Sequence, residues 1–158
     1  MSIATLILGQ SGTGKSTSMR NLNPAETLLI QSIKKPLPFR SAGWQPLTKE
    51  GGNVYVCDKA ENICKIIEKT QKSIIVIDDF QYIMANEFMR RTAEKGYDKF
   101  TDIGRAAWDI FNAATGAADH KRVYILSHTE QNESGTTKIK TIGKMLDEKI
   151  TLEGMVTI

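Results

Sequence analysis

Nine consecutive residues near the start of the chain combine glycines with a lysine and several hydroxyl side chains. They are Gly9, Gln10, Ser11, Gly12, Thr13, Gly14, Lys15, Ser16 and Thr17. The first eight match the pattern G-x-x-x-x-G-K-[ST], in which glycines let successive backbone N–H groups point at phosphate oxygens. An apolar run precedes this glycine loop and a helical stretch follows it, as the pattern requires. The spacing therefore predicts a site for the phosphates of a nucleoside triphosphate.

The last residues of the glycine loop have the side chains that a nucleotide and its metal need. Lys15 is expected to reach the β- and γ-phosphates, and the Ser16 hydroxyl is expected to ligate Mg²⁺. Thr17 is placed to support the α-phosphate. We also expect the helix after the loop, which stops at Asn23-Pro24, to direct the positive end of its dipole at the same anion.

Two adjacent acids, Asp78 and Asp79, directly follow the apolar run of residues 73–77. Because Mg²⁺ prefers carboxylate oxygens, Asp78 is predicted to hold the metal, directly or through water. Asp79 is the candidate for polarising the attacking water, a role that Glu holds more often. A second interpretation of Asp79 stays open, because an aspartate at this point also caps a helix that begins near Gln81.

A third polar pair, Ser127 and His128, follows the apolar run of residues 122–126. P-loop ATPases of the additional-strand type keep a polar sensor near the γ-phosphate at this position, so His128 is the candidate and Ser127 its alternative. A histidine at a strand end is also often an ordinary polar residue with satisfied hydrogen bonds. His120, which precedes the same run, is expected to be structural or exposed.

Lys138 and Lys140 flank one apolar residue, so both ammonium groups point the same way if this segment is extended. Three interpretations stay open for them: a solvated hairpin, a contact to the phosphates of a nucleic-acid strand, and a lysine inserted at the γ-phosphate of a neighbouring subunit. Residues 34–40, with Trp44, mix cations and aromatic rings as single-strand binders do. The same segment could equally cover a nucleotide base or a subunit edge.

Apolar patterns predict the elements that bring these side chains together. Five short apolar runs are predicted as strands, at residues 3–8, 27–33, 54–57, 73–77 and 122–126. Helices are predicted around residues 60–67, 82–94, 100–114 and 144–150. Strands that alternate with helices predict an α/β fold with a mostly parallel sheet and helices on both faces. Ligands bind at the carboxyl ends of such strands, where all three polar clusters lie.

The composition sets the class of protein but not its function. A length of 158 residues predicts a single domain over residues 1–158. Hydrophobic residues at 41% and charged residues at 25% exclude a disordered or a membrane protein. The net charge of +3 is too small to indicate a nucleic-acid partner by itself. Cys57 and Cys64 lack a metal-binding spacing and the N-terminus lacks a secretory pattern, so a cytoplasmic protein with reduced thiols is expected.

Longer stretches of the chain resemble a family of small phage-encoded ATP-binding proteins, related to the RecA-like single-strand annealing proteins of phages. These stretches are GQSGTGKSTSMRNL, KKPLPFR, VIDDFQYIMANEFMRR, GYDKFTDIG and IGKMLDEKITLEGM. The order of a strand before GQSGTGKST, a strand before DD and a strand before SH also resembles the RecA/Rad51-type ATPase core. The resemblance spans nearly the whole chain. It implies a RecA-like P-loop domain that binds and hydrolyses ATP with Mg²⁺.

The resemblance also implies where such a protein acts and with what. It implies work in DNA recombination or replication on single-stranded DNA, in the host cytoplasm, by a homo-oligomer. Phage recombination proteins or single-strand-binding proteins would be its partners. In that core, the loops after the acidic strand and after the sensor strand face DNA, and here these would be residues 85–101 and 129–141.

Two features depart from the RecA-like pattern. RecA-like enzymes place a catalytic Glu after the second strand, where this chain has QSIK at residues 31–34. Either Asp79 takes that role, or hydrolysis is slow and the protein is chiefly a nucleotide-dependent binder. The chain also ends inside an apolar run at residues 155–158, so we expect truncated C-terminal strands and an exposed sheet edge that favours association.

The sequence is therefore consistent with three functions. The leading one is Mg-dependent ATP hydrolysis by a RecA-like phage ATPase. The second is a nucleotide-gated interaction protein with little hydrolysis, which the missing Glu suggests. The third is a P-loop small-molecule or nucleotide kinase, in which Arg90 and Arg91 could contact the transferred group, although no arginine-rich lid follows the third strand. Both arginines are otherwise expected on a solvated helix face.

Overall fold

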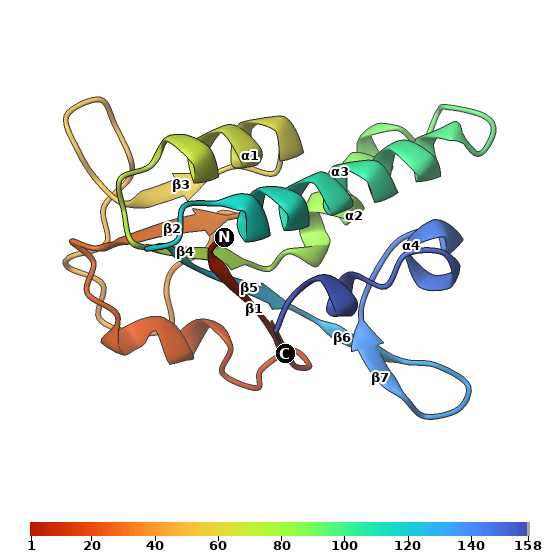
Figure 1. Cartoon of the computed structure of the whole chain (residues 1–158), viewed down its shortest axis with the longest axis horizontal. Helices are drawn as coiled ribbons and strands as arrows, with labels where there is room; N and C mark the ends of the chain where they lie inside the picture. The colour runs from red at the N-terminus through yellow and green to blue at the C-terminus, as the bar shows by residue number, and fades with distance from the viewer. Residues whose placement is uncertain (158) are drawn as a thin grey trace.

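Five parallel strands form the central sheet of this protein, seen in a computed structural model that describes residues 1–157 apart from the side chain of Asp147. The strands are β1 (Ile3–Leu8), β2 (Thr27–Gln31), β3 (Val54–Val56), β4 (Ile74–Asp78) and β5 (Arg122–Ser127). Their order across the sheet is β1-β5-β4-β2-β3 (Figure 1). β5 thus lies between the strand before the glycine loop and the strand that ends in Asp78. The predicted parallel sheet is confirmed.

The strand register brings the carboxyl ends of the strands to one edge of the sheet. Leu8 of β1 lies opposite Ser127 of β5, and Gln31 of β2 lies opposite Asp78 of β4. All five residues of β2 are buried, because both faces of the sheet are covered. Covered faces explain why the strands are continuous apolar runs rather than alternating patterns. The residues that follow these strands are therefore neighbours in space.

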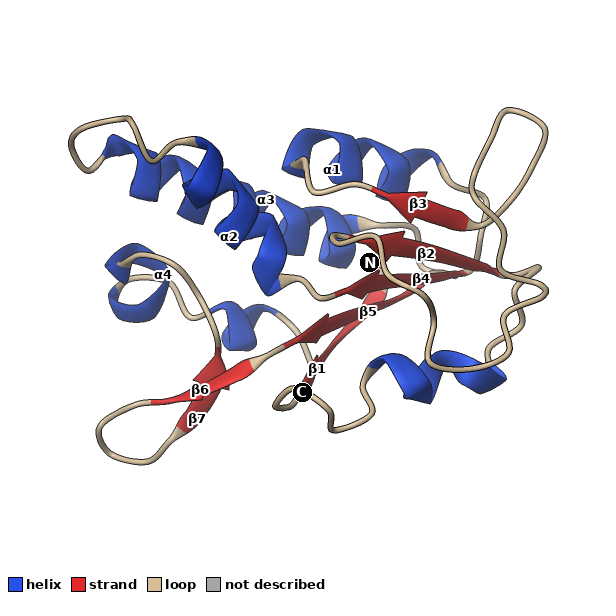
Figure 2. Ribbon diagram, turned by 180° about the vertical axis from the view of Figure 1, so that it is seen from behind, coloured by secondary structure: helices blue, strands red, loops and turns tan. Residues whose placement is uncertain are grey.

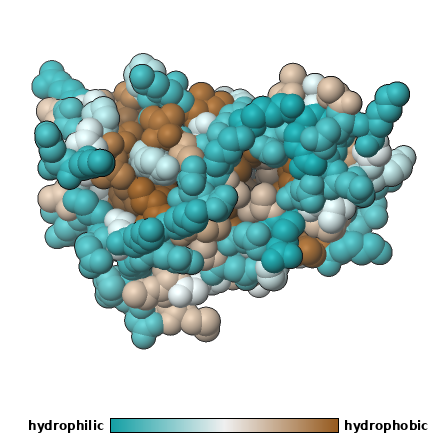
Figure 3. Space-filling view, turned by 90° about the horizontal axis from the view of Figure 1, so that it is seen from above, coloured by the Kyte–Doolittle hydropathy of each residue, from teal (hydrophilic) through white to brown (hydrophobic). Residues whose placement is uncertain are grey.

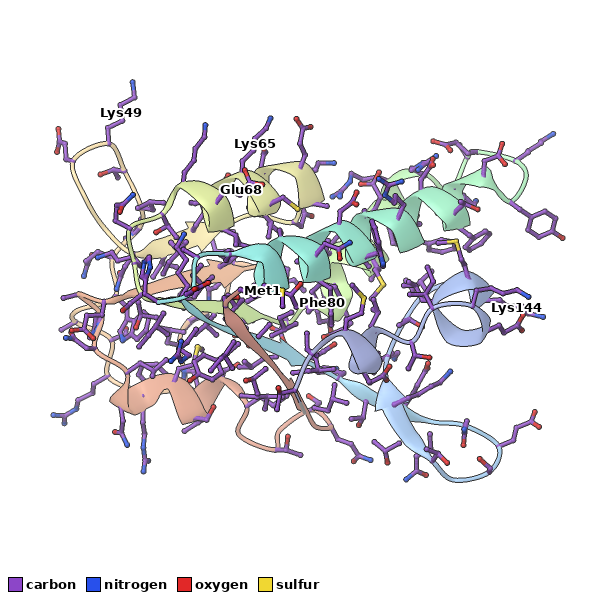
Figure 4. All side chains as sticks on the ribbon, viewed as in Figure 1. Met1, Lys49, Lys65, Glu68, Phe80 and Lys144 are labelled. Carbon is purple, nitrogen blue, oxygen red and sulfur yellow. The ribbon has the colours of Figure 1, made fainter. Side chains whose placement is uncertain are left out.

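Three α-helices cover one face of the sheet, and their bounds agree with the predicted segments within a few residues (Figure 1). They are α1 (Ala60–Lys69), α2 (Gln81–Arg90) and α3 (Asp98–Gly116). The aromatic ring of Phe80, just before α2, packs edge-to-face on Phe111 of α3 with ring centroids 5.3 Å apart. Figure 4 shows Phe80 between the sheet and the helices, at the centre of the larger apolar core.

The opposite face of the sheet has a thinner cover. It consists of a six-residue 3₁₀-helix, η1 (Ser16–Asn21), and the loop that carries Trp44. Their apolar side chains pack on the sheet in a second, smaller core, whose buried members are Met19, Leu29, Trp44, Val76 and Leu126. Helical structure on both faces is therefore present, as predicted, but one face has only η1.

The short helical stretch after the glycine loop ends before Asn23-Pro24, as predicted, but it is a 3₁₀-helix and not an α-helix. The backbone becomes extended at Leu22, and Asn23 precedes Pro24, a position that disfavours the α-helical region. A 3₁₀-helix also has less favourable hydrogen-bond geometry than an α-helix. The helix dipole expected at the end of the glycine loop is correspondingly small.

The chain continues from β5 into a hairpin and two short helical segments (Figure 2). These are β6 (Thr129–Gln131), β7 (Thr137–Ile139), α4 (Lys144–Glu148) and η2 (Leu152–Met155). Thr157 then forms a parallel bridge with Thr5 and covers part of the β1 edge. The strand expected over residues 155–158 is thus reduced to one bridge, the β1 edge is less exposed than expected, and Ile158 lies outside the described residues.

The face of the molecule seen in Figure 3 is mostly hydrophilic, with hydrophobic areas between the hydrophilic side chains. Within residues 1–157, none of the helices combines the length and the apolar character that crossing a membrane requires. Cys57 and Cys64 are both free thiols, as the sequence predicts, and burial raises the pKa of Cys64 to about 11.

Replacing Lys121 with methionine is expected to destabilise the fold. The Lys121 ammonium is buried and donates hydrogen bonds to the carbonyl oxygens of Ile67 and Glu68, at 2.8 and 3.2 Å, in the last turn of α1. Methionine keeps most of the apolar stem but leaves these carbonyls unpaired, so the free energy of unfolding should fall by about 1–3 kcal/mol. Urea denaturation measures this loss.

The matched control is Lys65→Met on the exposed side of the same helix. Lys65 forms only a surface ion pair with Glu61, and Figure 4 shows it projecting outward from α1. Its replacement should change the free energy of unfolding by no more than about 0.5 kcal/mol. Equal losses in the two variants would contradict a capping role for Lys121.

Candidate functional site

The polar clusters predicted at separate strand ends meet at the carboxyl edge of the sheet. The Ser16 hydroxyl lies 3.0 and 2.9 Å from the two carboxylate oxygens of Asp78 and donates to them. Asp79 Oδ1 lies 3.8 Å from Nε2 of His128. Residues that are 62 positions apart in the first pair thus form one site, which β1, β4 and β5 position.

The glycine loop has the backbone conformation that its sequence pattern requires. Gly12 and Gly14 have φ angles of +79° and +89°, which residues with side chains rarely adopt. Gly9 is needed for space, because a Cβ there would lie 2.6 Å from Oγ1 of Thr13. Residues 10–14 are exposed to solvent. The loop is therefore accessible to a ligand at the end of β1.

The Lys15 side chain folds back over its own loop. Its ammonium donates hydrogen bonds to the carbonyl oxygens of Gly9 and Gln10, at 2.7 and 2.8 Å. Burial lowers the pKa of Lys15, and the charges of Asp78 and Asp79 oppose that effect. The ammonium group is thus held beside the exposed loop by two neutral acceptors, which an anionic ligand would outcompete.

Asp78 is the more deeply buried acid of the pair, with an exposed fraction of 1%. Burial raises its pKa and the adjacent charge of Asp79 raises it further, while Lys35 and the Ser16 hydroxyl act in the opposite direction. A buried carboxylate is costly unless a cation or hydrogen-bond donors compensate it. Asp78 therefore provides a fixed negative charge where positive charge is favoured.

Asp79 has a φ angle of +58° and is the one residue other than glycine in the described chain with a positive φ. Aspartate tolerates this left-handed conformation better than most residues. The residue that caps α2 is Phe80, and among the described residues no side chain caps that helix end. The interpretation of Asp79 as a helix cap is therefore wrong. Its carboxylate instead bonds to Lys35 and faces His128.

Lys35 is a site residue that the sequence patterns do not predict. Its ammonium donates a hydrogen bond to Asp79 Oδ2 and lies 3.6 Å from Asp78 Oδ2 and 3.5 Å from Ser16 Oγ. Burial opposes its charge, but its hydrogen bond to Asp79 and the two negative charges outweigh this and raise the pKa of Lys35. The available signal was its place shortly after β2, whose Gln31 lies beside Asp78.

Gln81 is a second site residue that sequence patterns miss. Its Oε1 accepts hydrogen bonds from the Ser127 hydroxyl and from the backbone N–H of His128, at 3.2 and 3.1 Å. The backbone N–H of His128 can donate only to the oxygen of the Gln81 side-chain amide and not to its nitrogen, so this contact fixes the orientation of that amide. Its Nε2 is buried and has no hydrogen-bond partner among the described residues. The site thus holds an unsatisfied N–H donor close to His128.

The structure distinguishes between the two candidates for the sensor position. Ser127 is fully buried and its hydroxyl bonds to Gln81. The His128 ring is partly exposed, faces Asp79, and packs edge-on against Tyr82 with centroids 6.1 Å apart. His128 is therefore the one that reaches the acid pair. His120 is exposed at the other end of β5, as expected.

His128 is expected to make the folded protein less stable at mildly acidic pH. Burial lowers the pKa of His128, and the positive charge of Lys15 lowers it further, so the native imidazole is neutral at pH 7. The unfolded chain, with an ordinary histidine pKa of about 6.5, then binds more protons than the folded one. The free energy of unfolding should consequently decrease as the pH falls through about 6.5.

Urea denaturation at pH 7.5 and 5.5 tests this for the wild type and for His128→Gln. The variant should lose less stability between the two pH values, because glutamine does not titrate, while all other groups remain the same. Equal losses for both proteins would contradict a neutral, desolvated His128.

The hairpin places Lys138 and Lys140 on either side of Ile139, which is buried. The Lys138 ammonium lies 3.4 Å from the Glu130 carboxylate on the paired strand, in agreement with the solvated-hairpin interpretation. Lys140 lines a cavity of about 100 Å³ together with His128. Of the two lysines, Lys140 is thus the one connected to the site.

The two arginines at the end of α2, Arg90 within the helix and Arg91 just after it, are engaged in ion pairs. Arg90 pairs with Asp58 and Glu87, and Arg91 pairs with Glu94 and Asp102. The family resemblance implies a DNA-facing loop over residues 85–101, but most of this range is helical, in agreement with the helices predicted from the apolar pattern: α2 extends to Arg90 and α3 begins at Asp98. The connection between these helices is residues 91–97, so this part of the expected DNA-facing surface is much shorter than predicted.

The aromatic residues of the segment from Lys34 to Trp44 contribute to packing. The rings of Phe39 and Trp44 meet edge-on with centroids 6.2 Å apart, and Trp44 is 8% exposed. Both belong to the smaller core on the η1 face of the sheet. Rings with this little free surface are poor stacking platforms for bases, which weakens the single-strand interpretation of this segment.

Oxygen donors at the site suit a magnesium ion bound together with phosphates. The Ser16 hydroxyl and the Asp78 carboxylate are hard ligands of the kind that Mg²⁺ prefers, and Mg²⁺ usually takes only one or two protein ligands besides phosphates and waters. An ammonium group lies among the same oxygens, which shows that they favour a cation. Among the described side chains, which exclude Asp147, no cluster of three or more His, Cys, Asp or Glu suited to a metal occurs.

A much larger cavity, of about 730 Å³, lies away from these residues. It is a groove between α1 and α3, lined by Cys64, Ala106, Ala113 and the acids along both helices. It includes none of the site residues described above. Size alone therefore does not identify the functional site, which is defined by converging charges and backbone donors.

Comparisons with known proteins give no further assignment. No protein-family model matches this chain, and no curated protein is significantly similar to it.

Proposed function

We propose that this protein is a RecA-like P-loop ATPase that binds Mg-ATP at the glycine loop and hydrolyses it. The proposal depends chiefly on the contact between the Ser16 hydroxyl and both carboxylate oxygens of Asp78, because P-loop chemistry needs a hydroxyl and an acid on one metal. The strand order adds support. β5 lies between β1 and β4, where P-loop ATPases of the additional-strand type have their extra strand.

Each residue of the site has a distinct role in binding. The glycine loop donates backbone N–H groups to the phosphates, and Lys15 exchanges its bonds to Gly9 and Gln10 for bonds to the β- and γ-phosphates. Ser16 and Asp78 would hold Mg²⁺, which neutralises charge on the phosphates when it is bound. Thr17 follows Ser16 in η1 and is assigned to the α-phosphate.

Hydrolysis transfers the γ-phosphoryl group to water. The water oxygen bonds to the γ-phosphorus while the bond from that phosphorus to the bridging oxygen breaks, giving ADP and inorganic phosphate. Asp79 accepts the water proton on Oδ1, the carboxylate oxygen that faces His128. Neutral His128, whose Nε2 lies 3.8 Å from that oxygen, can orient groups beside it.

The biological setting of the proposal comes from the family resemblance. It assigns the ATPase to phage DNA recombination or replication on single-stranded DNA, as a homo-oligomer in the host cytoplasm. The hairpin of residues 129–141 follows β5 at the same sheet edge as the glycine loop, so it is the surface through which DNA would affect the site. Lys138 and Lys140 are its cations.

One observation favours the alternative of a nucleotide-gated binding protein with little hydrolysis. The acid assigned as the base is already bonded to an ammonium group, that of Lys35, and no Glu follows β2. The kinase alternative is less favoured, because Arg90 and Arg91 are held by four carboxylates and would have to leave them to contact a transferred phosphoryl group.

Phosphate release from ATP, measured with Mg²⁺ or with EDTA and with or without single-stranded DNA, tests the proposal. We expect Mg-dependent turnover that DNA accelerates. A protein that does not bind ATP would overturn the proposal as a whole. Tight binding without release above a Lys15→Ala control would favour the nucleotide-gated alternative, and no DNA binding in either nucleotide state would remove the DNA part.

Replacing Asp78 with asparagine should weaken the binding of Mg²⁺. Asparagine has nearly the same shape and keeps an oxygen near Ser16, but it removes the negative charge that a hard cation prefers. The Mg²⁺ concentration for half-maximal ATP binding should rise about tenfold or more, which corresponds to roughly 1.4 kcal/mol. A fluorescent ATP analogue titrated with Mg²⁺ measures it, with Asp109→Asn on α3 as control. An unchanged midpoint would remove Asp78 from the metal site.

A further inference from the structure

The ammonium group of Lys35 lies among the oxygen atoms that the proposed function assigns to Mg²⁺. Its Nζ is 3.5 Å from Ser16 Oγ and 3.6 Å from Asp78 Oδ2, and it donates a hydrogen bond to Asp79 Oδ2. No other lysine or arginine of the described chain forms an ion pair with these acids. Lys35 belongs to a segment separate from the glycine loop and follows β2, the neighbour of β4.

We propose that Lys35 is a built-in counter-ion that Mg²⁺ displaces, and that its displacement releases residues 34–44 from the edge of the sheet. The protein would then report metal and nucleotide binding through this segment. This role rests on the proposed function, because it requires that Ser16 and Asp78 bind the metal of a nucleotide. It goes further by naming the part of the chain that responds.

The two cations compete because they use the same oxygens. Mg²⁺ binds its oxygen ligands at about 2.0–2.1 Å, so a metal on Ser16 and Asp78 would lie within a few ångströms of the Lys35 ammonium. Positive charges that close repel strongly at the edge of a protein interior. With neither cation present, two adjacent buried carboxylates would face each other uncompensated. The site is therefore expected to exchange one cation for the other.

The exposed fractions of Lys35 and Asp78 indicate which of these two side chains moves when a metal binds. Asp78 is 1% exposed at the end of a central strand, whereas the Lys35 side chain is 36% exposed. The lysine can turn into solvent without opening the core, but the carboxylates cannot leave. The backbone of Lys35 is tied to the sheet by one bond, in which Gln31 Nε2 donates to the Lys35 carbonyl at 3.1 Å.

Displacement of Lys35 is expected to change the solvent exposure of the Trp44 ring. Both residues line a cavity of about 620 Å³ between the segment and the end of β3, together with Leu37 and Val54. Movement of the Lys35 end of the segment changes the wall of this cavity and hence the exposure of the indole ring. Trp44 is thus an intrinsic reporter, once the other tryptophan, Trp108 on α3, is replaced with phenylalanine.

The first measurement uses metal alone. Binding of Mn²⁺, a spectroscopic substitute for Mg²⁺, is followed by the electron paramagnetic resonance signal of the free ion, without nucleotide. Lys35→Met should bind Mn²⁺ about tenfold more tightly than the wild type, because the competing charge is gone. Lys34→Met is the matched control: it removes the same charge from the neighbouring exposed lysine and should change the affinity less than threefold. Equal affinities for Lys35→Met and the wild type would overturn the proposal.

Two further variants keep the test informative if Lys35→Met does not fold. Lys35→Arg keeps the charge and should retain metal affinity close to that of the wild type. The double variant Lys35→Met with Asp79→Asn removes one charge of each sign, so the net charge of the pair stays the same. If Lys35→Met does not fold, this balanced variant should still bind Mn²⁺ more tightly than Asp79→Asn alone. No difference between those two proteins would overturn the proposal.

The second measurement follows acrylamide quenching of Trp44 in the Trp108→Phe background. Mg-ATP should increase quenching in the protein that has Lys35, whereas Lys35→Met should be quenched strongly before any ligand is added and change little afterwards. Unchanged quenching on Mg-ATP binding would overturn the release of residues 34–44. Failure to bind ATP would instead count against the proposed function, and the Mn²⁺ experiment would still decide the role of Lys35.

Discussion

Replacing Lys15 with alanine is expected to abolish ATP binding under ordinary assay conditions, with an affinity about a hundredfold below that of the wild type. The Lys15 ammonium lies over the glycine loop, held by the carbonyls of Gly9 and Gln10 at 2.7 and 2.8 Å. A charge-assisted bond to phosphate contributes up to about 3 kcal/mol, which is roughly a hundredfold in affinity. Equilibrium binding of a fluorescent ATP analogue measures the loss.

The control for this variant is Lys49→Ala. Lys49 lies at the tip of a loop far from the site, as Figure 4 shows, and its replacement removes the same charge from the protein. It should bind ATP as the wild type does. Circular dichroism of Lys15→Ala should stay native, because the loop is exposed and outside both apolar cores. Retained affinity in a folded Lys15→Ala protein would refute the phosphate site.

Replacing Asp79 with asparagine is expected to stop ATP turnover while ATP still binds. Asparagine tolerates the left-handed backbone of this position, where φ is +58°, so the fold should remain. It cannot accept the proton of the attacking water, and loss of a general base lowers the rate about 10²–10⁴-fold. Affinity for ATP should change only severalfold, since Asp79 is not assigned to the phosphates or the metal.

Phosphate release under saturating ATP, together with equilibrium binding, separates these effects. Asp109→Asn, which removes an exposed carboxylate from α3, should release phosphate at the wild-type rate. If Asp79→Asn retains turnover, the base must be another group near the γ-phosphate, and His128 would be tested next. If the wild type itself shows no turnover, the nucleotide-gated alternative would replace the enzyme proposal.

Much of the sheet could be predicted because each strand is a short apolar run buried on both faces. The three polar clusters could also be placed together, since carboxyl ends of parallel strands share one edge. The short helical stretch after the glycine loop ends before Asn23-Pro24, as predicted, but the sequence did not show that it is the 3₁₀-helix η1. Periodicity indicates an element but does not show how tightly a short one winds.

Lys35 and Gln81 could not be predicted as site residues from the sequence, and the physical reason is the same for both. Lys35 reaches the acid pair through the path of a loop, and Gln81 reaches His128 through its place in the first turn of α2. Neither path leaves a periodic pattern in the sequence. The φ angle of Asp79 likewise depends on how β4 connects to α2, and it determines that the carboxylate faces Lys35 rather than the helix end.

The direct connection of β5 to the hairpin has a mechanical consequence. His128 is the single residue between β5 and β6, and its carbonyl oxygen accepts the backbone N–H of Lys140 from the returning chain at 2.9 Å. The hairpin is therefore attached to the sheet directly at His128, and its turn, residues 132–136, lies at the end farthest from the sheet (Figure 2). A load applied at that end would turn the imidazole relative to Asp79, so a force outside the site would be felt at the proposed base.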